Sequence, residues 1–217
     1  YDISACLVGS EMCIRDRDES VCEILIHDNN SDEDMRDWLL SFSEAYSKVR
    51  VIYSNQNKGV AGGRNVLFKE ARGDVIVSVD SDSYCRGLGF VDRAKLILSD
   101  TGIGMCGVVG ANFSDYSKFE HVDIKDGAAE SFVDSLAGCC QIFRKSLYGK
   151  VFSMDTNYSP FWLEDTDLCL QLKAKGYKNF RYNSQGDYEH EWGGTGSELF
   201  PDAFREKLAY FNAKWEL

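Results

Sequence analysis

One stretch of this 217-residue chain carries the clearest structural signal: Gly73-Asp74-Val75-Ile76-Val77-Ser78-Val79-Asp80-Ser81-Asp82. The β-branched run at residues 75–79 predicts a buried strand. Two aspartates, Asp80 and Asp82, follow it directly. Because an unpaired carboxylate is costly in a protein core, these aspartates mark the carboxyl end of the strand, the edge where open α/β sheets bind ligands.

The spacing of Asp80 and Asp82 indicates a metal site. Two neighbouring carboxylates repel each other unless a cation lies between them, and hard oxygen ligands suit Mg²⁺ or Mn²⁺, which also hold phosphate oxygens. We therefore predict a divalent metal, Mn²⁺ or Mg²⁺, that neutralises a diphosphate. The alternative is a solvated turn, because Asp-Ser-Asp is also common in loops.

Two earlier segments have the same design, a strand that ends in polar residues at the start of a helix. Residues 23–26 lead into His27-Asp28-Asn29-Asn30-Ser31-Asp32, where Ser31 or Asp32 is placed to cap a helix. Residues 49–53 lead into Asn57-Lys58-Gly59-Val60-Ala61-Gly62-Gly63-Arg64-Asn65, which opens a helix to about residue 71. Glycine N–H groups and a helix amino end favour an anion, although a flexible turn has the same composition.

The order strand, helix, strand, helix, strand, with short connections, predicts a parallel sheet covered by helices. The carboxyl ends of parallel strands meet at one edge, so the three polar segments are expected to lie together there. The predicted fold class is therefore α/β, with its binding site at this shared edge.

Two downstream segments carry further candidate residues. In Trp162-Leu163-Glu164-Asp165-Thr166-Asp167-Leu168, the two adjacent carboxylates stand at the start of a predicted helix, where the helix dipole favours them. Glu164 and Asp165 are either capping groups or, for one of them, a general base for an attacking hydroxyl. His190 lies among acidic residues ahead of a glycine-rich stretch, and is either a structural histidine or a metal ligand.

Taken in order, these segments resemble the motifs of the family 2 glycosyltransferases over roughly residues 23–195. The matching residues are Asp28, Asn29 and Ser31, with Glu33 at the last position of that motif, then Asn57, Gly59, Arg64 and Asn65, then Asp80 and Asp82, then Gly138 with Cys139-Cys140-Gln141-Ile142-Phe143-Arg144-Lys145, then residues 162–168, and finally His190. The resemblance implies the GT-A fold, a Rossmann-like and mostly parallel central sheet flanked by helices, with a small sheet on the acceptor side.

The resemblance also implies a role for each matching residue. Asp165 is the expected general base, and Glu164 is expected to position the acceptor or the helix. The expected metal ligands are Asp80, Asp82 and His190. The residues expected to bind the nucleotide-sugar donor are Asp28, Asn30, Lys58, Gly59, Arg64, Asn65 and Asp80.

The implied reaction moves a sugar from a nucleotide-diphosphate sugar to the hydroxyl of a glycan, lipid-linked or small-molecule acceptor, with metal dependence and inversion at the anomeric carbon. Two alternatives belong to other classes. A nucleotidyltransferase also uses paired aspartates on an α/β sheet, but it needs a basic, glycine-rich loop after its first strand. A noncatalytic module would bind the nucleotide sugar without turnover.

The composition of the chain limits the kinds of partner that the protein binds and indicates its cellular compartment. The formal net charge of −11 argues against nonspecific nucleic-acid binding, and no apolar run approaches the about 20 residues that span a bilayer. The eight cysteines include Cys22, Cys106, Cys139 and Cys140 in core-like strands and form no Cys-x-x-Cys pair. Free thiols in a reducing compartment are the simplest interpretation, which predicts a cytoplasmic protein, either free or peripheral at the inner membrane surface.

The chain divides into three predicted regions. Residues 1–20 are expected to be an irregular leader, because Gly9-Ser10-Glu11-Met12-Cys13-Ile14-Arg15-Asp16-Arg17 resembles translated adapter sequence of metagenomic assemblies. On that interpretation the first strand and helix of the family are missing. Residues 21–112 are the expected nucleotide-sugar-binding half, and residues 113–217 are the acceptor-binding half of the same single domain, ending in a helix at about residues 201–215.

Overall fold

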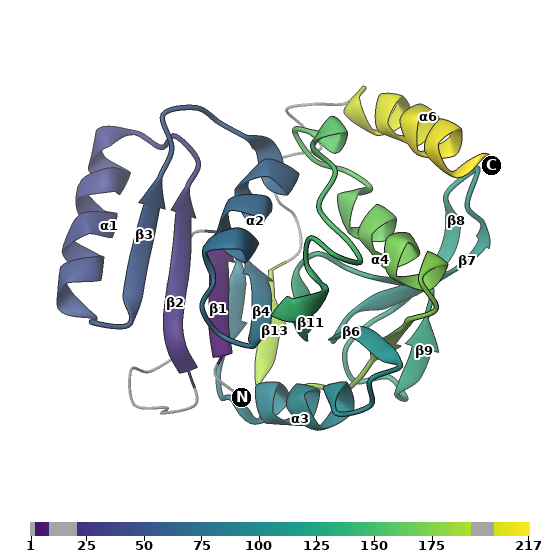
Figure 1. Cartoon of the computed structure of the whole chain (residues 1–217), viewed down its shortest axis with the longest axis horizontal. Helices are drawn as coiled ribbons and strands as arrows, with labels where there is room; N and C mark the ends of the chain where they lie inside the picture. The colour runs from purple at the N-terminus through teal and green to yellow at the C-terminus, as the bar shows by residue number, and fades with distance from the viewer. Residues whose placement is uncertain (1–2, 9–20, 192–201) are drawn as a thin grey trace.

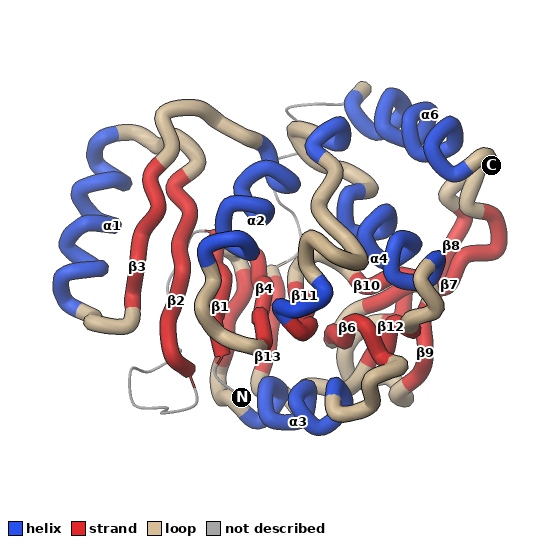
Figure 2. The backbone as a smooth tube through the Cα atoms, in the orientation of Figure 1, coloured by secondary structure: helices blue, strands red, loops and turns tan. Residues whose placement is uncertain are grey.

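The computed structural model describes residues 3–8, 21–191 and 202–217, and these form three layers, with helices on both faces of a central sheet (Figures 1 and 2). The strands of this sheet are β1 (Ile3–Val8), β2 (Val21–Asp28), β3 (Val49–Tyr53), β4 (Val75–Asp80), β6 (Ile103–Gly107), β9 (Ser131–Val133), β11 (Cys140–Arg144) and β12 (Lys178–Arg181). They lie in the order β3-β2-β1-β4-β11-β6-β12-β9. The first four are parallel, as are β6 and β12, whereas β11 and β9 run antiparallel to their neighbours.

Strands β2, β4 and β11 contribute to two cores, because successive side chains of a strand point to opposite faces. The helices that flank the sheet are α1 (Glu33–Ala45), α2 (Gly59–Glu70), α3 (Gly89–Leu98) and α4 (Glu164–Ala174). In β4, Val75, Val77 and Val79 pack in the core that includes residues of α1 and α3, whereas Ile76 packs in the core of α2 and α4. Burial on both faces is the reason that this strand has an uninterrupted apolar sequence.

Strand β1 differs from the irregular leader expected over residues 1–20. Ile3–Val8 pairs in parallel with β2 on one side and with β4 on the other. A run as apolar as Ile3-Ser4-Ala5-Cys6-Leu7-Val8 suits a central parallel strand. The chain therefore contains a strand at the position that was expected to be empty. Residues 1–2 and 9–20, the rest of the predicted leader, lie outside the described residues.

Local signals placed several of the predicted element boundaries close to the observed ones. The side chain of Asp32 accepts the N–H of Met35 at 3.0 Å, so Asp32 rather than Ser31 caps α1. Helix α4 ends just before Gly176, whose φ of 84° lies in the left-handed region that glycine adopts without strain. The strand predicted at residues 49–53 has those bounds as β3.

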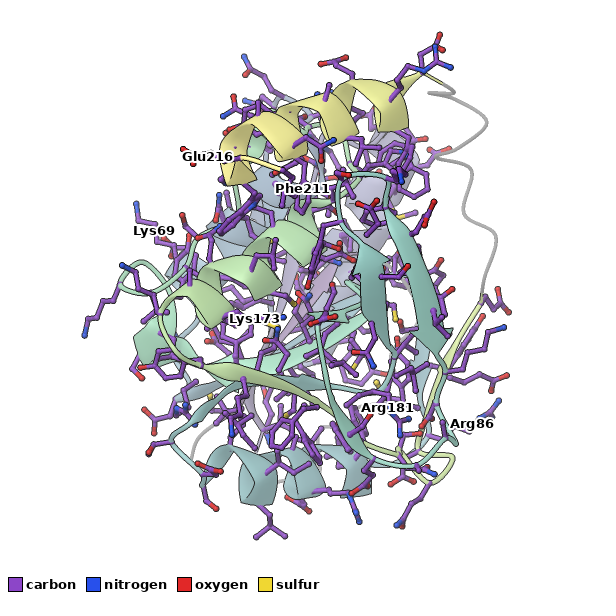
Figure 3. The ribbon with its side chains drawn as sticks, turned by 90° about the vertical axis from the view of Figure 1, so that its right-hand side faces the viewer. Lys69, Arg86, Lys173, Arg181, Phe211 and Glu216 are labelled. Atoms are coloured by element: carbon purple, nitrogen blue, oxygen red, sulfur yellow. The ribbon has the colours of Figure 1, made fainter. Side chains whose placement is uncertain are left out.

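Two small sheets lie beside the central one. One is a three-stranded sheet of β7 (Gly110–Asp115), β8 (Glu120–Ile124) and β10 (Ser135–Leu136). The other is a two-stranded ribbon of β5 (Ser83–Cys85) and β13 (Tyr188–His190). Two short 3-10 helices span Lys145–Leu147 and Thr156–Tyr158. The last helix, α6 (Ala203–Trp215), lies at the top of the view in Figure 3. Its Phe211 is buried with Tyr158 and Leu163 in a third apolar cluster, which attaches α6 to the segment before α4.

Cys22 is exposed, so its assignment to the core was wrong. The pairing of β1 with β2 matches Ile3 to Val21 and Ser4 to Glu23, which makes Cys22 the extra residue of a bulge. The thiols of Cys106, Cys139 and Cys140 are buried and free, as predicted. No helix within the described ranges is long and apolar enough to cross a membrane.

Candidate active site

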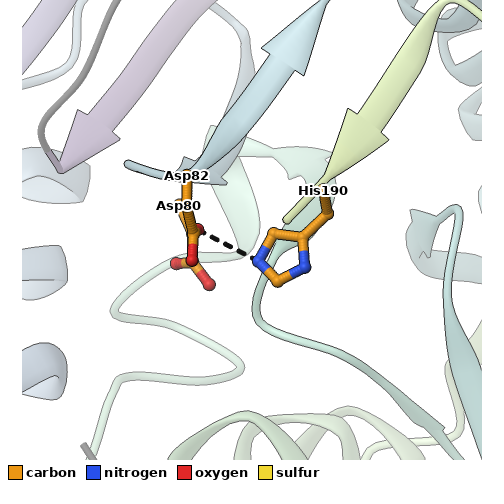
Figure 4. A group of neighbouring side chains, drawn as sticks. All are labelled: Asp80, Asp82 and His190. Atoms are coloured by element: carbon orange, nitrogen blue, oxygen red, sulfur yellow. Dashed lines mark ion pairs between the residues drawn. The ribbon is translucent and has the colours of Figure 1, made fainter. Parts of the chain in front are cut away.

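The three predicted metal ligands lie together at the carboxyl end of β4 (Figure 4). One ligand atom from each of Asp80, Asp82 and His190 lies within 4.8 Å of the other two. The His190 Nε2 atom is 3.0 Å from Oδ1 of Asp82. Two ligands on opposite sides of Mg²⁺ are about 4.2 Å apart, and Mn²⁺ accepts both carboxylate oxygen and imidazole nitrogen. The donor set therefore fits a small divalent ion.

Main-chain pairing brings His190 to Asp82. Strand β5 begins at the residue after Asp82, and its antiparallel register with β13 places His190 opposite Ser83. The N–H of Glu191 also donates to the carbonyl oxygen of Asp82 at 3.0 Å. The ribbon thus carries a histidine that is distant in sequence to the two aspartates.

Arg64 lies against Asp80. Its guanidinium pairs with the Asp80 carboxylate, and its Nη2 donates to the carbonyl oxygen of Gly138 at 2.9 Å. Burial lowers the pKa of this 2% exposed side chain, but the carboxylates of Asp80, Glu164 and Asp165 raise it above its usual value. Arg64 therefore stays charged and offsets part of the negative charge of Asp80, with which it pairs.

Gly138 connects Arg64 to the predicted base. Its N–H donates to Oδ2 of Asp165 at 3.0 Å, while its carbonyl oxygen accepts from Arg64. A Cβ at residue 138 would lie 2.7 Å from Nη1 of Arg64, so the close approach requires glycine. The N–H of Thr166 donates to Oδ1 of Asp165 at 2.6 Å. Burial raises the pKa of Asp165 although both hydrogen bonds oppose the shift, and the carboxylate is fixed in one orientation.

Glu164 has different surroundings from its neighbour. It is 8% exposed, and its Oε2 has no hydrogen-bond partner among the described residues. Burial, followed by repulsion from Asp165, raises the pKa of Glu164 above the usual 4.5. Glu164 therefore favours the protonated form, and Asp165, whose ionised form receives two N–H donors, is the better candidate for the general base.

Asp28 ends β2, and its side chain is 0% exposed. Its Oδ1 accepts the N–H of Ser31 at 2.9 Å, and its Oδ2 pairs with Nε of Arg36 at 2.8 Å. Burial raises the pKa of Asp28, but the hydrogen bonds from Ser31 and Arg36 lower it below its usual value. Asp28 thus holds the start of α1, and its contact with a nucleotide stays a prediction. Arg36 was not among the predicted site residues, although its place in the first turn of α1, close after Asp28, was a usable signal.

Asparagine side chains join the first two polar segments. The N–H of Lys58 donates to Oδ1 of Asn29 at 2.7 Å, and Nδ2 of Asn29 donates to Oδ1 of Asn57 at 3.0 Å. Gly59 donates its N–H to the same Asn57 oxygen at 2.9 Å. It has a φ of 67°, and a Cβ there would lie 2.4 Å from Oγ of Ser159. The loop conformation therefore depends on glycine at residue 59.

The remaining predicted donor-binding residues differ in their surroundings. Asn30 and Lys58 are exposed near the edge of the sheet, and Asn30 has a φ of 73°. Asn65 instead fixes α2 to the segment after β11: its Nδ2 donates to the carbonyl oxygen of Met154 at 2.7 Å, and its Oδ1 accepts from Met154 N–H and the Tyr148 hydroxyl. The structure gives Asn65 this structural role, and its contact with a donor stays a prediction.

These motifs and this fold have counterparts in known proteins. The chain belongs to the family 2 glycosyltransferases, because the model of Glycosyl transferase family 2 matches residues 12–152. The match includes Asp28, Arg64, Asp80 and Asp82. The candidate base and His190 lie beyond it.

Two bacterial proteins are similar in sequence. The uncharacterized protein y4gI of Sinorhizobium fredii is 23% identical over 221 residues, which cover 89% of this chain and 24% of that protein. An uncharacterized protein of Haemophilus influenzae is 33% identical over 72 residues, which cover 32% of this chain and 39% of that protein. The chain thus spans about a quarter of the length of the first relative.

Solved glycosyltransferase structures share the GT-A fold. GalNAc-T7 with UDP, GalNAc and Mn²⁺ has a TM-score of 0.69 and 13% identity, covering 83% of this chain and 41% of that chain. The mannosyltransferase PcManGT of Pyrobaculum calidifontis with GDP-Man and Mn²⁺ has a TM-score of 0.64 and 14% identity, with coverages of 85% and 56%. Staphylococcus aureus TarS residues 1–349 has a TM-score of 0.61 and 13% identity, covering 94% of this chain and 63% of that chain.

Proposed function

We propose that this protein transfers a sugar from a nucleotide-diphosphate sugar to an acceptor hydroxyl, using a divalent metal and inverting the anomeric configuration. The observation that carries the proposal is that Gly138 contacts both the candidate metal site and the candidate base. Its carbonyl oxygen accepts from Arg64, which pairs with Asp80 of the Asp80, Asp82 and His190 cluster. Its N–H donates to Asp165. Family membership and neighbours solved with UDP or GDP-Man and Mn²⁺ support it.

In this proposal the two halves of the chain bind different substrates. Residues 21–112 bind the donor, with Asp28, Asn30, Lys58, Gly59, Arg64, Asn65 and Asp80 facing or shaping its site. Residues 113–217 bind a glycan, lipid-linked or small-molecule acceptor. The cytoplasmic location expected from the cysteines belongs to the same proposal.

The chain's own residues account for the chemical step. Asp165 accepts the proton of the attacking hydroxyl, because its two N–H donors hold the carboxylate in one orientation. Arg64 lies beside Asp80 and contributes positive charge where the diphosphate gains negative charge. A bound divalent ion supplies further charge stabilisation to the departing nucleoside diphosphate. Attack from the face opposite the departing group inverts the anomeric carbon.

The test is titration calorimetry of UDP, dTDP and GDP into the protein, with Mn²⁺ and with a chelator. We expect binding of at least one nucleotide to require Mn²⁺, and Asp82→Asn or His190→Ala to weaken it by about tenfold or more. A second histidine–aspartate pair offers matched controls: Nε2 of His121 is 3.2 Å from Oδ1 of Asp123 on β8, so Asp123→Asn and His121→Ala should leave binding unchanged.

Equal affinity of the wild type and the Asp82 and His190 variants, with and without metal, would rule out the metal site. Product analysis then tests the reaction with nucleotide sugars as donors. Release of free nucleoside diphosphate supports glycosyl transfer, whereas release of pyrophosphate indicates nucleotidyl transfer. Nucleotide binding without any product across a donor and acceptor panel indicates a noncatalytic module.

A further inference from the structure

The strand that carries His190 also carries a buried hydroxyl, that of Tyr188. Tyr188 is 5% exposed and stands on β13 two residues before His190. Its hydroxyl donates to the carbonyl oxygen of Cys139 at 2.7 Å and lies 2.8 Å from Oγ of Ser83. Oγ of Ser83 also donates to the Cys139 carbonyl oxygen at 3.5 Å, so both hydroxyls contact the same carbonyl. Ser83 is the residue after Asp82, so this chain of hydrogen bonds begins at the metal aspartates.

The Cys139 carbonyl oxygen also contacts Asp80, another candidate metal ligand. It also accepts the backbone N–H of Asp80 at 3.2 Å. One carbonyl therefore holds the main chain of Asp80 and, through Tyr188, the strand that carries His190. The adjoining Gly138 binds Arg64 and Asp165, so a two-residue segment connects both sides of the site.

We propose that Tyr188 is a positioning residue of the divalent-metal site. The inference rests on the proposed metal-dependent function and adds a residue to which the family motifs give no role. The Tyr188 hydroxyl sets the distance between β13 and the Cys139 carbonyl, and so between His190 and the aspartates Asp80 and Asp82. Hydrogen bonds in a buried setting of low dielectric are strong enough to hold such an arrangement.

The way that β13 is attached to the central sheet explains why the Tyr188 hydroxyl affects the position of His190. Within the described residues, strand pairing joins β13 to β5 alone, and β5 follows Asp82. The central sheet that carries Asp80 is a separate sheet. Tyr188 contributes a bond between the two, so its loss frees the imidazole to shift relative to the Asp80 carboxylate without unpairing either sheet.

The experiment compares Tyr188→Phe with a matched control, Tyr182→Phe. Tyr182 is 0% exposed, and its hydroxyl donates to the carbonyl oxygen of Phe90 at 2.8 Å, away from the metal ligands. Each variant keeps the ring and removes a buried hydrogen bond to a backbone carbonyl, and Tyr188→Phe also removes the bond with Oγ of Ser83. Mn²⁺ affinity is measured by electron paramagnetic resonance of free Mn²⁺, with and without UDP, and thermal unfolding is measured in the presence of chelator.

We expect Tyr188→Phe to weaken Mn²⁺ binding by about three- to tenfold, the usual worth of one hydrogen bond. Tyr182→Phe should lower the unfolding temperature comparably and leave Mn²⁺ affinity unchanged. Equal Mn²⁺ affinity of the wild type and Tyr188→Phe, or an equal loss in both variants, overturns the positioning role alone. Failure of the wild type to bind Mn²⁺ under any condition overturns the metal site and this inference together.

Discussion

Glu164 and Asp165 are neighbours in sequence, yet their environments separate them. Asp165 is fixed by two backbone N–H groups, one from Gly138 and one from Thr166. Glu164 is buried, and its Oε2 meets no donor in the described ranges. The difference arises because Gly138, far away in the chain, approaches only one of the two carboxylates.

At this scale we expect Asp165→Asn to abolish most turnover and Glu164→Gln to affect it less. A general base contributes about 10²- to 10⁴-fold in rate, and asparagine keeps the shape without accepting the proton. The measurement is steady-state turnover with a donor identified by the nucleotide titration. Calorimetry with the same nucleotide is the control, because Asp165 acts on the acceptor and donor affinity should persist.

Two outcomes contradict these roles. Near-full turnover of Asp165→Asn combined with loss in Glu164→Gln reverses the assignment. Turnover retained in both variants means that the start of α4 is structural and that the base lies elsewhere.

At the scale of elements, one buried carboxylate attaches the last helix to the site. Asp167 on α4 is 0% exposed and accepts from Nε1 of Trp215 at 2.9 Å and Nζ of Lys214 at 2.9 Å, both on α6. Its other donors are the Tyr158 hydroxyl and Nε2 of Gln171. The third acidic residue of the Glu-Asp-x-Asp-Leu motif therefore holds α6 beside the candidate base.

We expect Trp215→Phe to lower the free energy of unfolding by about 1.5 to 3 kcal/mol, because it removes a hydrogen bond to a buried charged group. Urea denaturation measures the change. Trp38→Phe is the control: Trp38 is 42% exposed on α1, so its substitution should stay within about 0.5 kcal/mol. Equal effects of the two substitutions would show that the Asp167 contact contributes nothing to docking α6.

At the scale of the whole molecule, one continuous sheet joins the two predicted halves. Strand β4 of the first half pairs along five residues with β11 of the second half, from Val79 with Cys140 to Val75 with Arg144. Both major cores contain residues of both halves. Separate unfolding of either half would expose apolar surface of the other.

We therefore expect a single cooperative unfolding transition. Trp38 lies in the first half, and Trp162 and Trp215 lie in the second, so fluorescence reports on both. Transitions followed by far-ultraviolet circular dichroism and by tryptophan fluorescence should coincide. Two resolved transitions would show that the halves are independent domains.

Several parts of the site were predictable because their signals are local. The apolar run at residues 75–79 and the aspartates after it predicted β4 and its carboxyl end. Ser31 or Asp32 was predicted to cap α1, and Asp32 does so. The parallel sheet covered by helices followed from the order of such segments, and the GT-A fold was implied by the resemblance of the motifs to the family 2 glycosyltransferases. The central strand Ile3–Val8 was the error, because its sequence was interpreted with the adapter-like residues after it and not by its own apolar pattern.

By itself the sequence determined the strands and helices from β2 to β4, the helices α4 and α6, the edge where polar residues collect and the family. The meeting of His190 with Asp82, the place of Gly138 between Arg64 and Asp165, and the attachment of α6 to Asp167 arise only in three dimensions. Periodicity, capping residues and apolar runs are patterns of a few neighbouring residues, so they can be recognised in a single segment of the sequence. Contacts between distant segments depend on strand order, register and side-chain burial, which are set by the packing of the whole molecule.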